Sequence, residues 1–460
     1  MTERQLFVPP KPPSRPEGAS VLQRWKLARQ SIFAALKPTL YRAWMAEVKT
    51  PIRNAYLANQ PDLVKTALVD RPDDFPKAEA IRRTLYDLLG DSVFVTNGEL
   101  WKRQRRMIDP AFEGGRLRDV FPAMLDAAET SVDRLTTLAT GEPVEMEFET
   151  SHAAADVIFR TLFSEPIETE AAQSVFHAFR RYQRTAPVLS ILDIMNAPEW
   201  IPRPGRRRAK AEGKAIRALL RGFVEQRAAE IDAGAAPDDL ATKIMTTVDP
   251  VTGDRFDAAE MLDQVAIFFL AGHETSASAL AWTLYCLAND PEAQERARAE
   301  IADALGDRRP EFSDLRKLPF TRNVFREGLR LYPPVPMMVR ETVREETFRK
   351  RDLPVGSMFI LSPWHLQRHE RLWRDPDSFD PDRWTRAEER DAQRDAYMPF
   401  SAGPRVCTGA GFAMLEGVLL LASLLSAFRF EAVPDRPPQP VTQLTVRSDT
   451  GVWLSLTPVS

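Results

Sequence analysis

The sequence predicts a mostly α fold with a small β region. A capping pair, Asp257 and Glu260, opens a run that continues without an interior proline to Asn289. At ~1.5 Å per residue this run makes a helix of roughly 45 Å, long enough to cross a whole domain. Strand-like segments are few and lie mostly between residues 340 and 365. The middle of the chain contains no repeat and no linker.

Two further helices are predicted after the long one. Asp290 is a suitable N-cap, Pro291 suits the first helical position, and Gly306 is a suitable stop. The stretch "FTRNVFREGLRLY", residues 320–332, predicts another helix, which Pro333 ends.

Charge and cysteine content narrow the class of protein. The 460 residues include 62 Lys and Arg against 65 Asp and Glu, a formal net charge of −3 that argues against a protein built around binding nucleic acid. Two cysteines, Cys286 and Cys407, do not make a disulfide framework and favour a reducing compartment.

The N-terminal residues and the apolar segments indicate where in the cell the protein is expected. Prolines in residues 1–20 predict an extended arm, with the main domain over residues 21–460. The arm has no signal-peptide apolar stretch, and the longest apolar segments fall short of the ~20 residues that a membrane span needs. We therefore expect a soluble, cytoplasmic monomer without a transmembrane segment.

Cys407 lies in the stretch "FSAGPRVCTG", residues 400–409, between two apolar segments. Gly403 and Gly409 flank it, so the backbone can fold tightly and bring N–H groups close to the sulfur. The apolar helix predicted over residues 411–428 points its positive dipole end at the same sulfur. Both effects stabilise a thiolate, which acts as a metal ligand or as a nucleophile.

The residues alone leave three ordinary roles for this cysteine open. A structural zinc site needs further Cys or His ligands nearby, and the loop has none. A catalytic nucleophile needs a base, for which the five histidines give no specific support. A buried cysteine acting as a small hydrophobe is common, but it does not explain Arg405 and the two flanking glycines.

The loop resembles the haem-binding signature of the cytochrome P-450 superfamily, Phe-x-x-Gly-x-Arg-x-Cys-x-Gly. It matches at every fixed position, namely Phe400, Gly403, Arg405, Cys407 and Gly409. The resemblance implies a single-domain fold around a buried haem b, with the Cys407 thiolate as the axial ligand of the iron.

The spelling "FSAGPR" is similar to the fatty-acid-hydroxylase and microsomal-type branch of that superfamily. Val406 and Thr408 depart from the Asn and Ile that are common in this branch. The resemblance covers about residues 85 to 430, so a single catalytic domain is expected.

Glu327 and Arg330 in "REGLR" lie three apart, where the residues alone indicate a surface ion pair of ~0.5 kcal/mol. They match the family's Glu-x-x-Arg, and Arg383 in "FDPDRW" stands where the family places a third partner. The resemblance therefore implies a buried charged network that braces the wall near the cysteine loop. Asp382 stands where the family more often has Glu.

The stretch "NGELWKRQRRMIDPAF" resembles the family's segment beside one edge of the haem. Trp101 and Arg105, four apart on a helical turn, could present an indole N–H and a guanidinium to the haem propionates. From the residues of this stretch alone, a solvated basic turn is the simpler interpretation. By the resemblance, Arg340 and Arg405 are further propionate partners. The remaining basic residues of the turn are expected to face outward and to steer an acidic electron donor; they are Lys102, Arg103 and Arg106.

Glu274 and Thr275 follow the apolar run "VAIFFLAG" within the long helix. The Thr275 hydroxyl can compete for a backbone carbonyl and bend the helix, and Gly272 weakens helical order and leaves room for a small ligand. A polar pair within an apolar helix is more often a satisfied core detail or a solvated face. In the family the matching acid and alcohol form the oxygen-activation pair, so Thr275 would hold dioxygen and its water while Glu274 relays protons.

The resemblance implies a monooxygenase that inserts one atom of dioxygen into a hydrophobic organic substrate, by hydroxylation or epoxidation. Its electrons arrive singly, and the sequence shows no flavin or iron–sulfur segment, so a ferredoxin with its reductase or a flavoprotein is the expected donor. Two alternatives are a peroxide-using or peroxide-rearranging haem-thiolate enzyme and a non-catalytic haem sensor or carrier. Glu274 and Thr275 argue against both, since neither needs a proton-delivery pair.

Substrate contacts are expected at Ala271, Met337 and Met338, with the methionines as adaptable pocket residues. Residues 191–210 join an apolar stretch to five basic residues between Arg203 and Lys210, and they resemble the family's substrate-entry loop. From the residues alone, a solvated helix start is the simpler interpretation. As an entry loop, the segment would touch a membrane and admit a lipid-like substrate.

Overall fold

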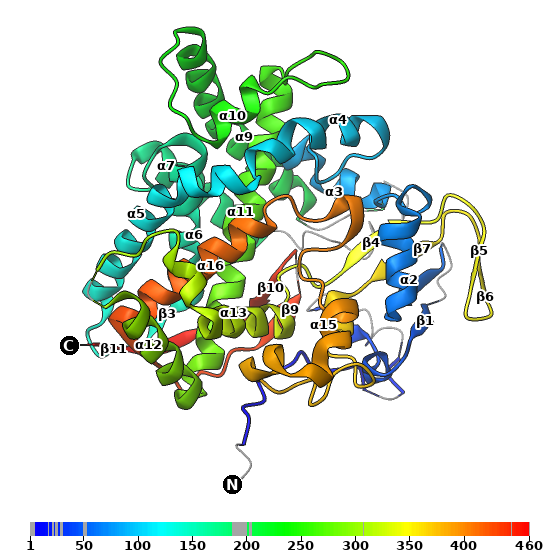
Figure 1. The fold of residues 1–460 in the computed structure, drawn as a ribbon. Helices are drawn as coiled ribbons and strands as arrows, with labels where there is room; N and C mark the ends of the chain where they lie inside the picture. Colours follow the sequence, from blue (N-terminus) through cyan, green and yellow to red (C-terminus); the bar gives the residue numbers. More distant parts are fainter. Residues whose placement is uncertain are drawn as a thin grey trace.

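The computed structural model describes residues 5–16, 18–20, 23, 26–27, 31–48, 53–185, 200–201, 205–306, 308–442 and 444–459. The predicted entry loop over residues 191–210 lies largely outside this described part. Figure 1 shows helices gathered around the central helix α11 (Ala258–Ala288), with strands on both sides of it. The predicted class, mostly α with a small β region, is confirmed.

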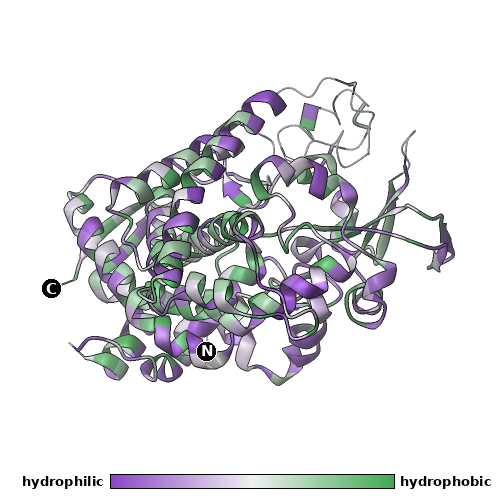
Figure 2. Cartoon of the chain, turned by 90° about the horizontal axis from the view of Figure 1, so that it is seen from above, coloured by the Kyte–Doolittle hydropathy of each residue, from purple (hydrophilic) through white to green (hydrophobic). Residues whose placement is uncertain are grey.

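Helices make up most of the described chain. Those of seven residues or more are α3 (Glu79–Leu89), α4 (Gly98–Ile108), α5 (Gly114–Leu138), α6 (Met146–Phe163), α7 (Glu170–Thr185), α9 (Arg206–Asp232), α10 (Leu240–Thr246), α11 (Ala258–Ala288), α12 (Pro291–Leu305), α13 (Pro319–Leu331), α15 (Arg390–Ala396) and α16 (Ala410–Ala427). Two shorter ones are α2 (Pro61–Lys65) and α14 (Pro363–Leu366). Seen from above, most outer helices carry both hydrophilic and hydrophobic residues, as expected for helices that bury one face (Figure 2).

The predicted helix boundaries are confirmed within one residue. Asp257 and Glu260 form a reciprocal capping box at the start of α11, with the Glu260 N–H donating to Asp257 Oδ1 over 2.7 Å. The Asp290 carboxylate caps α12, which ends at Gly306 with a φ of +56°. Helix α13 ends at Leu331, ahead of the two prolines that cannot continue it.

The strands are short and more widely spread along the chain than predicted. One sheet has the order β1 (Met45–Val48), β2 (Ala55–Ala58), β7 (Met358–Leu361) and β4 (Met338–Glu341), with β2 and β7 parallel. The others are β3 (Val144–Glu145) with β11 (Trp453–Pro458) and β8 (Phe428–Ala432), the hairpin β5 (Glu346–Phe348) with β6 (Arg351–Leu353), and β9 (Pro440–Thr442) with β10 (Val446–Ser448). Strands of two to six residues leave little alternating pattern to detect in a sequence.

Helix α11 crosses the centre of the core. From Ser276 to Ala288 every residue is buried, and the helix packs most extensively on α6. Gly272 allows this approach, because a Cβ there would lie 2.3 Å from Cδ1 of Ile158 on α6. The expectation that Gly272 weakens the helix is wrong, since α11 is continuous through it and the glycine serves helix packing.

The described part of the proline-rich arm lies against the domain. The Tyr332 hydroxyl donates to the carbonyl oxygen of Pro10 over 2.7 Å, and the Phe379 N–H donates to that of Phe7 over 2.8 Å. The Phe7 ring meets Tyr285 of α11 edge-on, with centroids 5.9 Å apart. These contacts tie residues 5–16 to the core.

Candidate active site

The loop around Cys407 is a tight turn closed by backbone hydrogen bonds. The N–H of Cys407 donates to the carbonyl oxygen of Phe400 over 2.9 Å, and that of Val406 donates to Gly403 over 3.0 Å. Gly403 has a φ of +67°, and a Cβ there would lie 1.9 Å from the carbonyl oxygen of Leu68. Both conformation and space therefore require glycine at position 403.

Gly409 has a different part in the loop. Its φ is −87°, and a Cβ there would make only ordinary contact with Cys407 Sγ, 4.0 Å away. Its backbone N–H hydrogen-bonds to the sulfur, and this bond together with the Arg105 charge lowers the pKa of Cys407. Burial nevertheless raises the pKa of the free thiol above its usual value. The predicted stabilisation of the thiolate is therefore present, but in the free thiol it is smaller than the opposing effect of burial.

The Cys407 side chain is accessible, although the protein atoms packed around it raise the pKa of its thiol. A metal ion at the sulfur would reverse the shift by binding the thiolate. In the described residues no group of three His, Cys, Asp or Glu side chains could hold a metal ion, so a multi-residue zinc site is not found there.

Two arginines and a tryptophan lie beside the cysteine loop. The guanidinium carbon of Arg405 is 4.1 Å from the centre of the Trp101 ring, and that of Arg105 is 6.0 Å away. Arg105 Nη1 donates to the carbonyl oxygen of Val406 over 2.7 Å, and Arg405 Nη2 donates to Asn97 Oδ1 over 2.9 Å. The structure thus brings three of the predicted cofactor-binding residues together.

Arg340 and Lys77 extend this group. A backbone β-bridge joins the two residues, and burial together with the Arg405 charge lowers the pKa of Arg340 to about 10. Burial and the charges of Arg340, Arg405 and Arg105 hold the pKa of Lys77 well below its usual value. Arg340 Nε is buried and has no hydrogen-bond partner among the described residues. We call Lys77, Arg105, Arg340 and Arg405 the cation cluster.

The cation cluster fits a ligand with two carboxylates. Its members repel one another, and among the described carboxylates only Asp109 pairs with a member of the cluster, Arg105, over 2.9 Å. Excess buried positive charge is costly unless an anion compensates it. The two propionates of a haem would supply that charge beside the Cys407 sulfur, so the residues present fit this group. Sequence reasoning missed Lys77, because no motif marks it.

The basic residues expected to face outward are compensated within the chain. Lys102 pairs with Glu99 over 2.8 Å, and Arg103 pairs with Glu260 over 2.6 Å. Arg106 pairs with Asp249 over 2.6 Å. These pairs remove most of the positive field that was expected to steer an acidic electron donor.

Glu327, Arg330 and Arg383 form a buried charged network with no exposed surface. Arg330 donates to both carboxylate oxygens of Glu327, over 2.8 and 2.9 Å, and Arg383 Nε donates to Glu327 Oε1 over 3.0 Å. Burial alone would raise the pKa of Glu327, but the two guanidiniums outweigh it and hold that pKa below its usual value. Arg383 also pairs with Glu389 over 2.8 Å, a partner that sequence reasoning missed. Asp382 instead forms an exposed pair with Arg296.

Glu274 and Thr275 point to different surroundings. Thr275 Oγ1 donates to the carbonyl oxygen of Ala271 over 2.5 Å, which is the predicted competition for a backbone acceptor. The buried Glu274 carboxylate accepts from Thr445 Oγ1 over 2.7 Å. Burial raises the pKa of Glu274, although the nearby Arg447 charge opposes this. No hydrogen bond joins Glu274 to Thr275 in this part of the described chain.

A second buried acid lies next to this pair. Glu416 of α16 accepts a hydrogen bond from Ser276 Oγ over 2.5 Å, and its other oxygen has no partner among the described residues. Burial raises the pKa of Glu416 to about 8. Sequence reasoning missed it, although an acid within the apolar run of residues 411–428 was a visible signal.

The expected substrate residues are only partly brought together. Ala271 and Met337 both pack, half-buried, against the main hydrophobic core. Met338 packs against a second cluster that contains Tyr56 and Leu361. Because neighbouring residues along a strand point in opposite directions, Met337 and Met338 pack against different clusters.

The family model for cytochrome P450 matches residues 9–453 of this chain. The chain belongs to the cytochrome P-450 family. It is a monooxygenase with a haem-iron cofactor. Monooxygenases of this family use dioxygen, redox partners and hydrophobic substrates.

Several proteins similar to this cytochrome P-450 have known activities or names. Cyclooctat-9-en-7-ol 5-monooxygenase of Streptomyces melanosporofaciens is 34% identical over 396 residues, which cover 85% of this chain and 83% of the relative. Cyclooctatin synthase of the same organism is 29% identical over 432 residues, 91% of each chain. Protein LUTEIN DEFICIENT 5, chloroplastic, of Arabidopsis thaliana is 27% identical over 420 residues, 87% of this chain and 70% of the relative.

One described helix of this cytochrome P-450, α16, is long and apolar enough to cross a membrane. More than half of it is buried inside the protein, as in the core helix of a soluble protein. It begins just after the cysteine loop and carries Glu416, so its apolar character serves the core beneath the site.

Proposed function

We propose that this protein inserts one atom of dioxygen into a hydrophobic organic substrate, with Cys407 as the axial ligand of a haem b. The observation that carries the proposal is an accessible cysteine in a tight loop, beside a cation cluster in which, among the described residues, only Arg105 has a carboxylate partner. When bound, the haem iron supplies the redox chemistry that cleaves the oxygen–oxygen bond. The chain's own residues hold that group and manage protons.

In this proposal the cofactor is held from two sides. The Cys407 sulfur binds the iron, in a loop kept tight by Gly403, Gly409 and the Phe400 carbonyl. The indole of Trp101 and the cation cluster bind the propionates, which satisfies the buried Nε of Arg340. The network of Glu327, Arg330 and Arg383 is a structural brace behind this loop rather than a catalytic group.

Glu274 and Thr275 are proposed to hold and move protons during the reaction. Because burial raises the pKa of Glu274, its carboxyl can carry a proton closer to neutral pH than an exposed acid can. The Thr275 hydroxyl already donates to Ala271, so its oxygen lone pairs are the part that can accept from a water. Ala271 and Thr275 are half-buried on a segment of α11 whose following residues, 276–288, are all buried, which supports this placement.

The substrate is proposed to be a hydrophobic alcohol or a similar lipid-like molecule. One relative is named for a 5-monooxygenase activity on cyclooctat-9-en-7-ol. Ala271 and Met337, which pack against the same core, are the proposed substrate contacts. Met338 packs against the second cluster and would contact the substrate from there. A spectral titration with cyclooctat-9-en-7-ol, fatty acids and aromatic compounds tests this. A response to aromatics alone would contradict it.

The electron donor is proposed to be a separate ferredoxin with its reductase or a flavoprotein, acting on a cytoplasmic monomer. Product formation from dioxygen with a reducing system, compared with peroxide alone, tests the reaction type. The proposal predicts product in the first reaction, with one oxygen atom taken from ¹⁸O-labelled dioxygen. Turnover with peroxide alone, and none with dioxygen and reductant, would favour the peroxide-using alternative.

A further inference from the structure

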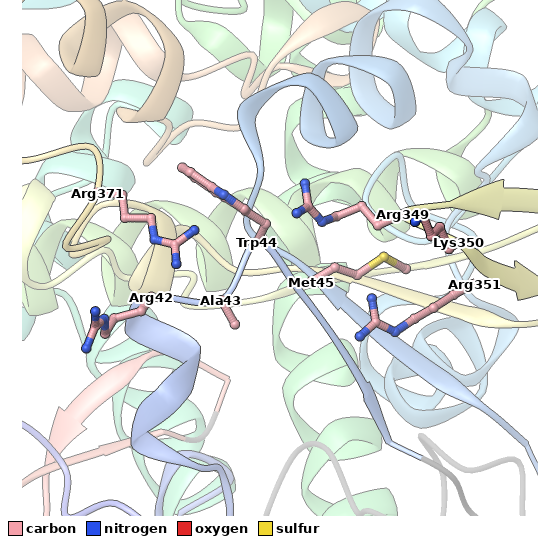
Figure 3. A pocket seen from close by; sticks show the side chains of 8 residues that line it. All are labelled: Arg42, Ala43, Trp44, Met45, Arg349, Lys350, Arg351 and Arg371. Carbon is pink, nitrogen blue, oxygen red and sulfur yellow. The ribbon is translucent and has the colours of Figure 1, made fainter.

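A basic pocket lies apart from the cysteine loop, where the start of β1 meets the turn between β5 and β6 (Figure 3). Its volume is about 460 Å³. Ala43 and Met45 line it together with one aromatic and five cationic side chains, namely Trp44, Arg42, Arg349, Lys350, Arg351 and Arg371. None of the described residues that line it carries a carboxylate. In Figure 1 the β5–β6 hairpin projects at the edge of the molecule, away from α11.

Most of the charge in this pocket is uncompensated. Arg42 pairs with Glu370 over 3.2 Å, and Arg349 donates to the amide oxygen of Gln60 over 2.6 Å. Among the carboxylates that the structure describes, none forms an ion pair with Lys350, Arg351 or Arg371. This differs from the basic turn of α4, where each of the three cations has an acidic partner. Like charges gathered without partners repel one another and attract an anion.

The hairpin turn holds two of these cations in an unfavourable backbone conformation. Arg349 and Lys350 are the two turn residues between the paired Phe348 and Arg351, and their φ values are +50° and +61°. Such a turn favours Asn-Gly, because residues with a Cβ rarely adopt positive φ. Backbone strain of this kind is characteristic of functional positions.

The opposite wall of the pocket is held firmly. The Trp44 ring stacks on His369 with centroids 4.3 Å apart and an interplanar angle of 11°. The Arg371 guanidinium carbon lies 5.5 Å from the centre of the same ring. The Trp44 carbonyl oxygen accepts from the N–H groups of Asn59 and Gln60, over 2.9 and 3.1 Å. Three separate segments of the chain thus present their cations around a fixed aromatic side chain.

We propose that this pocket binds a soluble ligand that carries two or more phosphate groups. Guanidinium groups bind phosphate oxygens in pairs, and several cations around one concavity match more than one phosphate. A membrane surface fits less well, because Met45 is buried and the pocket offers no exposed apolar side chain for insertion. The pocket shares no residue with the cysteine loop, so this site is separate from the one that holds Cys407.

The test is calorimetric titration of the full-length protein with tripolyphosphate at low ionic strength. The variant Arg349→Asn/Lys350→Gly removes two charges and installs the favoured turn sequence, so binding should weaken at least tenfold while the Tm stays equal or rises. The control Lys214→Gln/Arg221→Gln removes two charges from the exposed face of α9 and should bind like the wild type. A rise or no change in Tm also shows that the turn variant is folded.

Three outcomes would overturn the proposal. One is an absence of tripolyphosphate binding to the wild type. Another is an equal loss of binding in the α9 control, which would indicate attraction by net charge alone. The third is binding to phosphatidylglycerol vesicles, but not to phosphatidylcholine vesicles or to tripolyphosphate, which would assign the surface to a membrane instead.

Discussion

Gln367 Oε1 accepts a hydrogen bond from the N–H of Met398 over 2.8 Å. Its amide nitrogen donates to the carbonyl oxygens of Leu329 and Arg330, each over 2.9 Å. Arg330 Nη1 in turn donates to the carbonyl oxygen of Gln367 over 2.8 Å. Since Met398 lies two residues before Phe400, the buried Gln367 connects the charged network on α13 to the cysteine loop.

Replacing this glutamine should loosen the cysteine loop. Gln367→Leu leaves the Met398 N–H and two carbonyl oxygens buried without partners, at ~1–3 kcal/mol for each such group. We expect a lower Tm and faster transfer of haem to an acceptor protein. Gln226→Leu, at an exposed position of α9, is the matched control and should change neither. Normal haem retention in Gln367→Leu would show that the link is dispensable.

The charged network should be essential for keeping the cofactor. Glu327→Ala leaves the buried guanidinium of Arg330 without its carboxylate partner, a loss of roughly 3–5 kcal/mol, while Arg383 keeps Glu389. We expect little or no haem in the purified variant. Asp382→Ala breaks the exposed pair with Arg296 and should cost less than ~1 kcal/mol. Equal haem content in both variants, measured by absorbance per protein, would contradict a bracing role for Glu327.

Thr275 should govern how oxygen is used rather than whether the cofactor binds. Without its hydroxyl the water that delivers a proton is no longer ordered, so hydrogen peroxide escapes in place of product. Thr275→Ala should keep its haem and consume reductant while product per electron pair falls. Glu274→Gln should instead slow turnover, because an amide cannot relay protons as a carboxyl does. Unchanged coupling in Thr275→Ala would remove the proton-delivery role.

Glu416 should make stability depend on pH. Burial raises its pKa to about 8 in the folded protein, whereas an unfolded glutamate ionises near ~4.3. The folded state therefore keeps a proton that the unfolded state loses, and stability falls as pH rises from about 4.5 to 8. Glu416→Gln keeps an acceptor for Ser276 and removes this loss of up to ~5 kcal/mol. Its Tm advantage over the wild type should grow between pH 5 and pH 8. An advantage independent of pH would contradict the buried neutral acid.

Local signals in the sequence predicted the helix ends and the motif-bearing segments, because these features depend on local structure. The ends of α11 and α12 follow from Asp257, Asp290 and Gly306, because caps act within one turn. The cysteine loop and the network of Glu327 with its arginines were found through motifs, whose spacing encodes a shared geometry.

The remaining features arise from contacts between distant segments. Lys77 meets Arg340 only because residues 77 and 340 form a β-bridge, and Gln367 reaches Met398 across 31 positions. The strands of two to six residues are set by such pairings rather than by their own pattern. Thr445 and Glu389 likewise carry no motif, so the partners of Glu274 and Arg383 had to come from the structure.

The central claim is that Cys407 binds the haem iron, and the absorption spectrum of the reduced, carbon-monoxide-bound protein tests it most directly. The wild type should show the band diagnostic of thiolate ligation. Cys407→Ser should lose this band, while Cys286→Ser should keep it, because Cys286 is fully buried in α11 and away from the loop. Persistence of the band in Cys407→Ser, or its loss only in Cys286→Ser, would contradict the account.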